Sequence, residues 1–125
     1  MNNVCWKKNI ADELYIRGGT MNSFDECINS GVKFAEKGNF SDALSAFAKA
    51  KNYAYSKEQK AIAYWNSAIA RASKGDAVDC IFDLGVVLEN DPNHTNARKS
   101  LINFSNDTSL PSGVRELAIK KLSGN

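Results

Sequence analysis

The sequence predicts an all-α fold, an α-solenoid of stacked antiparallel helical hairpins. Two observations support this prediction. A degenerate segment occurs twice, at residues 30–39 and again 37 residues later at 67–76. In both copies a run of helix-forming residues ends at Lys-Gly, and a capping residue then begins a second helical run. A repeat of this length is typical of helical hairpins that bury their apolar faces by stacking on one another.

The first repeat is expected to contain two helices, over residues 24–37 and 40–53. Ser23 and Glu26 have the spacing of a capping box, which pairs free amides at a helix start. Gly38 can adopt the left-handed conformation that ends a helix, and the next residue, asparagine, is expected to cap the following helix. The apolar residues of that second helix recur every three or four positions, as on one helical stripe. They are Phe40, Ala43, Leu44, Phe47 and Ala50.

The second repeat follows the same plan. Ser56 and Gln59 form another capping box at the start of a third helix. Gly75 ends that helix, and Asp76 is expected to cap a fourth helix that runs to Glu89. The apolar stripe of the fourth helix consists of Cys80, Ile81, Leu84, Val87 and Leu88.

A C-terminal pair of helices is expected to cap the stack. Pro92 suits the first turn of a helix over residues 93–104, because the amide that proline lacks would have no partner there. A last helix is expected over residues 111–122, after a polar loop. Lys120 and Lys121 lie near its negative end, which favours a helix. The predicted limits are repeats over 24–55 and 56–92, a cap over 93–125, and an extension over 1–22.

The N-terminal extension leaves alternatives open. It is either disordered or contains a short amphipathic helix over residues 10–16, and such a helix could fold onto the repeats. In addition, residues 17–20, Arg-Gly-Gly-Thr, can be encoded by a purine-rich stretch that resembles a bacterial ribosome-binding sequence. We therefore also consider Met21 as the natural start of the chain.

Composition favours a single cytoplasmic domain in a reducing compartment. Hydrophobic residues make up 43% and charged residues 24% of 125 residues, as is usual for a soluble globular domain. No apolar run has the length of a membrane helix, and the first residues lack the apolar core of a signal peptide. The three cysteines, Cys5, Cys27 and Cys80, are scattered and odd in number, so a disulfide framework is not expected. Cys27 and Cys80 lie on apolar stripes and are expected to pack as small hydrophobic residues.

The residues that catalysis or cofactor binding needs do not form a recognisable set. The single histidine, His94, is near a predicted helix start and is expected to face solvent. It cannot complete a zinc site with scattered thiols. No Ser/His/Asp set, acid pair or phosphate-binding loop is recognisable. We therefore expect no enzyme, no metal and no cofactor.

Nucleic-acid binding is a lesser alternative. The formal net charge is only +2, from 16 basic and 14 acidic residues. Binding to phosphate needs clustered charge. The candidate cluster at the C-terminal end is expected to be an ordinary solvated face. It consists of Arg98, Lys99, Arg115, Lys120 and Lys121.

The two repeats resemble the tetratricopeptide repeat, whose pattern is W-x-x-L-G-x-x-Y, then G, then A-x-x-x-F-x-x-A. The residues of the first copy that match are Gly31, Phe34, Gly38, Phe40, Ala43, Phe47 and Ala50. The second copy matches at Ala68, Gly75 and Pro92, with Cys80, Leu84 and Val87 as apolar substitutes. The departures are Cys27 and Tyr64 for tryptophan, Ser30 and Ser67 for leucine, Arg71 for the aromatic residue, and Ala77 for an aromatic.

The resemblance implies close helix approach at small residues and interior phenylalanines. Gly31, Ala43, Ala68 and Cys80 are expected where helices of one hairpin approach each other. Phe34, Phe40 and Phe47 are expected to fill the surrounding space.

The resemblance also implies a concave groove, formed by the first helix of each hairpin, that binds a peptide or helix of another protein. The groove residues are expected to be Ile28, Asn29, Val32, Ile62, Trp65, Asn66 and Ile69, followed by Asn96, Lys99 and Asn103. Adjacent helical residues point about 100° apart, so Tyr64 is assigned to the interhelical contact and Trp65 to the groove. Trp65 would then be the anchor of an interface. Because Ile28 and Val32 replace polar donors, a chaperone carboxyl tail is not the expected ligand.

The sequence thus predicts a cytoplasmic interaction adaptor or scaffold without enzymatic activity. A structural subunit that uses the same surface for homo-oligomerisation is the alternative, and Trp65 would then be buried against a second copy or the N-terminal extension.

Overall fold

The structure, a computed structural model, describes residues 23–124, and this part of the chain contains six helices and no strand. The helices are α2 (Ser23–Glu36), α3 (Phe40–Tyr53), α4 (Lys57–Lys74), α5 (Ala77–Asn90), α6 (Thr95–Asn106) and α7 (Ser112–Leu122). The expected helix over residues 10–16, the alternative start at Met21 and the thiol of Cys5 lie outside the described residues. The all-α prediction is confirmed for the described residues, and their six helices match the predicted ones to within about two residues.

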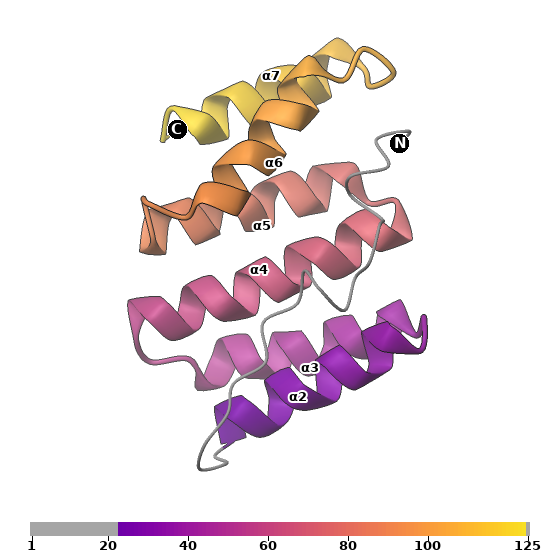
Figure 1. The fold of residues 1–125 in the computed structure, drawn as a ribbon, viewed down its shortest axis with the longest axis vertical. Helices are drawn as coiled ribbons and strands as arrows, with labels where there is room; N and C mark the ends of the chain where they lie inside the picture. Colours follow the sequence, from indigo (N-terminus) through magenta and orange to yellow (C-terminus); the bar gives the residue numbers. More distant parts are fainter. Residues whose placement is uncertain (1–22, 125) are drawn as a thin grey trace.

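Successive helices follow one another along the long axis of the molecule (Figure 1). Each helix packs against the next one in the chain, from α2 on α3 to α6 on α7. Among helices that are not consecutive, the more extensive contacts join α2 to α4 and α5 to α7. The first of these contacts brings two of the predicted groove helices together.

Helices α2 and α4 end with the same local structure. Gly38 and Gly75 have φ of +80° and +92°, the left-handed conformation that glycine adopts without strain. After each glycine the next amide donates to a carbonyl five residues earlier, Asn39 to Phe34 and Asp76 to Arg71, at 2.9 Å in both cases. These are Schellman motifs, which satisfy the last carbonyls of a helix. The two predicted helix stops are therefore confirmed.

The predicted side-chain caps at these two places are wrong. Asn39 and Asp76 occupy the N-cap positions of α3 and α5, but neither side chain makes a capping hydrogen bond. Their ψ angles of 70° and 76° lie outside the extended region that favours this bond. At Ser56, where ψ is 159°, Oγ accepts from the Gln59 amide at 3.0 Å, as predicted. The Gln59 side chain accepts in turn from the amide of Tyr55, one residue before the cap.

The contact between α2 and α3 is closest where Gly31 meets Phe47. Phe47 is fully buried, and a Cβ atom built on Gly31 would overlap its ring. This confirms the predicted close approach at glycine. Ala43, Ala68 and Cys80 are also fully buried, as expected.

Two other predicted core phenylalanines behave differently. Phe34 is 37% exposed, so its predicted place in the interior is wrong. Phe34 belongs to the last turn of α2 and lines a shallow cleft between α2 and α3. Phe40 is partly buried against the core.

The start of α6 also differs from the prediction. The helix begins at Thr95 rather than at residue 93, and Pro92 lies in the turn before it. His94 is the N-cap, and its Nδ1 atom accepts from the Ala97 amide at 3.0 Å. The sequence suggested that Pro92 marks the start of this helix. In the structure the Nδ1 atom of His94 caps it instead. His94 is therefore a structural residue and does not simply face solvent.

Candidate functional site

The structure places the predicted groove residues of the two repeats on α2 and α4, which contact each other. Three pairs of these residues are each 37 positions apart, namely Ile28 and Trp65, Asn29 and Asn66, and Val32 and Ile69. Both helices therefore present the order apolar, amide, apolar. We call the seven residues the α2–α4 face, which consists of Ile28, Asn29, Val32, Ile62, Trp65, Asn66 and Ile69.

The side chains of this face lie in an interior environment. Apart from Asn29, which is half-buried, they are between 0 and 9% exposed. Trp65 at 5% is more buried than its neighbour Tyr64, which is partly buried against the core. The face is thus closed in this structure, where the sequence suggested an open groove. Its role in binding a partner stays a prediction.

The three expected groove residues of α6 are not brought to this face. Asn96, Lys99 and Asn103 are exposed on α6. The extensive contacts of that helix are with α5 and α7. The predicted continuation of the site onto α6 therefore lacks an extensive helix contact that would align it with α2 and α4.

Trp65 contacts the imidazole of His94. The ring centroids are 4.9 Å apart and the planes are inclined by 42°. His94 therefore does two things, since it caps α6 and packs against the largest side chain of the α2–α4 face. Burial lowers the pKa of His94, and the nearby Asp91 carboxylate acts in the opposite direction. A lowered pKa agrees with the hydrogen bond, because Nδ1 accepts from Ala97 only while it is deprotonated.

This geometry predicts a loss of stability on mild acidification. The pKa of His94 is lower in the folded than in the unfolded chain, where a histidine titrates near 6.5. As the pH falls below that value the unfolded chain takes up the proton first, so the free energy of unfolding decreases until the folded pKa is reached. The expected decrease is about 1 kcal/mol, the usual contribution of a capping side chain. Urea unfolding at pH 7.5, 6.5 and 5.5 measures it.

The matched control is His94→Asn, since asparagine caps helices well and does not titrate. This variant should lose the pH dependence between pH 7.5 and 5.5 and retain most of the stability at neutral pH. An equal acid dependence in the variant and the wild type would show that other groups cause it.

A polar cluster lies next to the α2–α4 face and joins α3, α4 and α5. Its centre is Asp83, which is 8% exposed on α5. The Ser67 hydroxyl donates to Asp83 at 2.6 Å, and Arg71 Nε lies 3.5 Å from the same carboxylate. Lys51 Nζ donates to Ser67 Oγ at 3.1 Å and lies 3.5 Å from the second oxygen of Asp83.

The cluster gives a structural role to two polar residues of α4. Ser67 and Arg71 both bind Asp83. Sequence analysis missed this cluster. The sequence did contain a signal for it, because Asp83 lies between the apolar residues Ile81 and Leu84. The preceding helix carries Ser67 and Arg71, which can bind a carboxylate.

Lys51 is held by a ring as well as by charge. Its ammonium lies 4.3 Å from the centroid of Tyr64, a distance at which a cation and an aromatic face attract each other. Burial lowers the pKa of Lys51, an effect that the Asp83 carboxylate opposes. Its contacts with Asp83, Ser67 and Tyr64 stabilise the packing of α3 against the second helix pair.

The two described thiols have no activating environment. Cys80 is fully buried, and burial raises its pKa well above the ordinary value. Burial also raises the pKa of Cys27, although Lys49 acts in the opposite direction. A raised pKa leaves little of the nucleophilic thiolate at neutral pH. The prediction that the two residues pack as small hydrophobic side chains is confirmed for Cys80, while Cys27 is half-buried.

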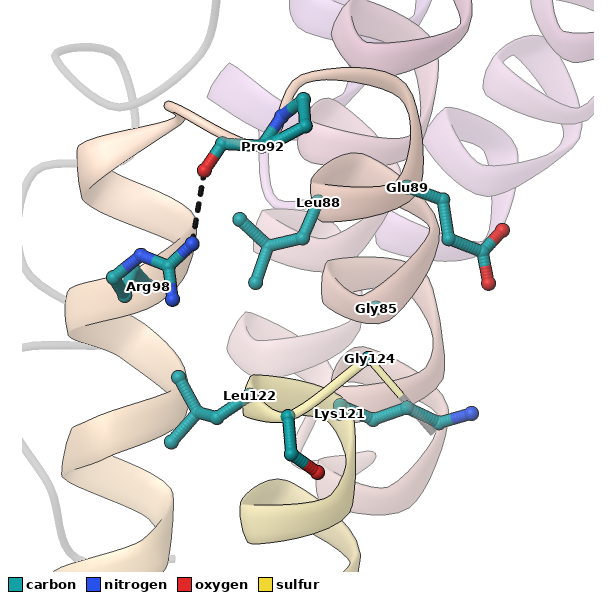
Figure 2. Close-up of a pocket in the computed structure, with 9 residues that line it drawn as sticks. Gly85, Leu88, Glu89, Pro92, Arg98, Lys121, Leu122 and Gly124 are labelled. Atoms are coloured by element: carbon teal, nitrogen blue, oxygen red, sulfur yellow. Dashed lines mark hydrogen bonds between the residues drawn. The ribbon is translucent and has the colours of Figure 1, made fainter.

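Among the clefts lined by described residues, two shallow ones lie away from the α2–α4 face and include none of its residues. One has a volume of about 320 Å³ between α2 and α3, with Cys27, Phe34 and Lys49 among its lining residues. The other, of about 230 Å³, lies between α5, α6 and the end of α7 (Figure 2). Arg98 and Lys121 line it together with Glu89.

Arg98 and Lys121 belong to the basic residues considered for nucleic-acid binding, and both contact neighbouring residues of the protein. Arg98 donates to the carbonyl of Pro92 at 2.9 Å (Figure 2). Lys121 crosses α5 at Gly85, where an added Cβ atom would lie 2.8 Å from its Cδ atom. Its ammonium lies 4.9 Å from the centroid of the Phe82 ring. Both residues therefore help to pack the last helices.

Comparisons with known proteins leave the chain without an assigned family. No protein-family model, curated protein or solved structure matches it. Among the described residues, no helix is long and apolar enough to cross a bilayer. Nor do three His, Cys, Asp or Glu side chains of residues 23–124 form a group that could hold a metal ion.

Proposed function

We propose that this protein is a small interaction adaptor that binds a peptide or a helix of another protein at the α2–α4 face. The observation behind this proposal is the recurrence of apolar, amide and apolar residues on two helices in contact. Amide side chains can pair with a peptide backbone, while flanking apolar residues hold its side chains. A tryptophan among aliphatic residues is a common energetic centre of an interface.

The proposal extends to the arrangement of the helices. We infer that α2–α3 and α4–α5 are two repeats of a tetratricopeptide-like α-solenoid and that α6–α7 cap them. The two Schellman motifs, 37 residues apart, support this inference, as do the sequential packing of the helices and the contact of Gly31 with Phe47. A repeat array needs such a cap, because its terminal units otherwise expose apolar surface.

Burial of the face decides how the proposal is tested. A charged residue in place of Trp65 would unfold the protein, because an unpaired buried charge is costly. A photoreactive side chain avoids this difficulty when it is introduced at a half-buried or exposed position. Benzoylphenylalanine at Asn29 would report on the face, and the same residue at the exposed Ser45 of α3 is the control.

The expected result is a crosslinked partner from lysate at position 29 and not at position 45. The crosslink should disappear when an unlabelled wild-type protein competes. A partner that crosslinks only at position 45 would move the binding surface to α3 and contradict the proposal.

Homo-oligomerisation is a second candidate, and exposed apolar side chains favour it. Val78 and Phe82, one turn apart on α5, are 42 and 47% exposed. Ile119 of α7, the helix that packs on α5, is 53% exposed. Sedimentation over a range of protein concentrations tests this function. A monomer throughout would exclude it, whereas a concentration-dependent dimer that Phe82→Ser abolishes would support it.

A further inference from the structure

We propose that the cleft between α2 and α3 binds a guanidinium group, the side chain of an arginine in a partner protein. We call it the α2–α3 cleft. Its volume is about 320 Å³, and its lining residues include Glu26, Ser30, Phe34, Asp42, Ala46 and Lys49. This volume lies at the lower end of the range for small-ligand pockets, about 300–1,000 Å³. The inference does not depend on the α2–α4 face, because the cleft includes none of the residues of that face.

The backbone around the cleft has an equivalent 37 residues later, in α4–α5. Helix α3 (Phe40–Tyr53) and helix α5 (Ala77–Asn90) begin and end 37 residues apart. The Schellman motifs that precede them correspond as well, since the carbonyls that accept the 2.9 Å bonds belong to Phe34 and Arg71. The side chains at positions 34 and 71 therefore start from the same local backbone, in the last turn before a helix stop.

At the equivalent place in α4–α5 the molecule itself holds a guanidinium. Arg71 Nη1 lies 3.2 Å from Asp79 Oδ2, and Arg71 Nε lies 3.5 Å from Asp83 Oδ2. The residues 37 positions earlier are Phe34 for Arg71, Asp42 for Asp79 and Ala46 for Asp83. The α2–α3 cleft therefore keeps one of the two carboxylates and lacks the guanidinium.

The carboxylate of Asp42 is available to a ligand. Asp42 is exposed on α3, and none of the ion pairs found within residues 23–124 involves it. Lys49, a basic residue of the same cleft, is seven residues farther along α3, which is about 10 Å along the helix axis. Charges at the surface that are this far apart are largely screened by salt. A cation that enters the cleft near Asp42 would therefore gain an ionic partner.

Phe34 adds an aromatic surface to the same cleft. It is 37% exposed, so part of its ring can contact a ligand. A guanidinium stacks on an aromatic face and donates two N–H groups to a carboxylate. Ala46 is small and leaves room where Asp83 stands in the other helix pair. The ring and the carboxylate together favour a planar cation over the ammonium of a lysine.

An arginine within a protein chain fits the cleft better than the free amino acid. Glu26 lines the same cleft, and its carboxylate would repel the α-carboxylate of free arginine. An arginine inside a chain has no α-carboxylate. Ser45 also lines the cleft, so the crosslinking experiment at positions 29 and 45 separates a partner of the α2–α4 face from one of the cleft.

The experiment titrates the full chain, labelled with ¹⁵N, with the peptide N-acetyl-Gly-Arg-Gly-amide and follows the backbone amide shifts. The matched ligands carry citrulline, which has the shape of arginine without its charge, or lysine in place of arginine. We expect the arginine peptide to bind about tenfold more tightly than the citrulline peptide, because an exposed ion pair and an exposed cation–π contact each contribute a few-fold. The lysine peptide and free arginine should bind several-fold more weakly than the arginine peptide. The largest shift changes should lie within residues 26–49.

Variants of the protein test the role of the carboxylate. Asp42→Asn should weaken binding of the arginine peptide about fivefold, the upper range for an exposed ion pair. The matched control is Asp79→Asn, at the equivalent carboxylate that already binds Arg71, and it should leave the binding unchanged. Both aspartates are exposed, so neither replacement disturbs the interior. Phe34→Arg should abolish binding, because it brings a guanidinium of the chain itself into the cleft.

Phe34→Arg also tests the geometry without any ligand. If a guanidinium at position 34 reaches the Asp42 carboxylate, adding Asp42→Asn to this variant should lower the folding equilibrium constant about threefold. The same Asp42→Asn change in the wild type should leave that constant unchanged. Urea unfolding of the four proteins measures the difference.

Four results would overturn the inference. Equal binding of the arginine and citrulline peptides would exclude an ionic contact, and equal binding of the lysine peptide would exclude recognition of a guanidinium. Equal losses in Asp42→Asn and Asp79→Asn would place the site elsewhere. Independent effects of Phe34→Arg and Asp42→Asn on folding would show that a guanidinium in the cleft does not reach the carboxylate. Free arginine that binds as tightly as the peptide would contradict the assignment to a partner protein.

Discussion

Replacement of Phe47 by alanine should destabilise the protein by about 3–5 kcal/mol, the usual cost for a buried phenylalanine. Phe47 is fully buried on α3 and lies against Gly31 of α2. Gly31 has no side chain to fill the resulting cavity, so little relaxation is available. This loss is large compared with a domain stability of about 5–15 kcal/mol. Thermal and urea unfolding, followed by circular dichroism, measure it.

The matched control for this prediction is Phe34→Ala. Phe34 is on the same hairpin but is 37% exposed. Its replacement should cost less than about 1.5 kcal/mol, because much of its surface is already in water. Similar losses for the two variants would contradict the placement of Phe47 at the centre of the hairpin.

Replacement of Asp83 by alanine has the second largest expected effect, a loss of about 2–3 kcal/mol. Asp83 is the common partner of Ser67, Lys51 and Arg71. Without Asp83, the ammonium of Lys51 on α3 and the guanidinium of Arg71 on α4 remain near each other and partly shielded from water. Breaking a fully buried ion pair costs about 3–5 kcal/mol. We expect less here, because the Lys51 and Arg71 side chains are 20 and 29% exposed.

Asp79→Ala is the control for the charge change. Asp79 also binds Arg71, at 3.2 Å, but its side chain is 58% exposed. An exposed ion pair contributes at most about 1 kcal/mol. If both variants lost the same stability, the position of Asp83 in the interior would not matter. If Asp83→Ala were neutral, the cluster would not stabilise the junction of the helix pairs.

The sequence was sufficient for the helices because their signals are local. Gly38 and Gly75 end helices through a backbone conformation that glycine adopts readily, whatever surrounds it. Ser56 caps α4 through residues three positions apart. The contact of Gly31 with Phe47 was also predictable, since a repeat pattern places a small residue opposite a large one.

Burial on the predicted face was less predictable, because it depends on elements distant in sequence. Tyr64 and Trp65 are adjacent, and their helical angle alone says only that they point in different directions. Trp65 is the more buried of the two, in contact with His94 from the turn before α6. The start of α6 was placed two residues too early for a similar reason. A histidine rarely signals a helix start, and its role here depends on an acceptor nitrogen that the sequence does not reveal.

The polar cluster also makes the helix pairs α2–α3 and α4–α5 unequal. Lys51 of α3 corresponds, 37 residues later, to Leu88 of α5. A second copy of α2–α3 placed after α3 would therefore bring no carboxylate to Lys51. A helix pair placed after α5 would meet an apolar residue there and need no such carboxylate. The contacts of Lys51 with Ser67 and Asp83 thus favour the observed order of the two helix pairs.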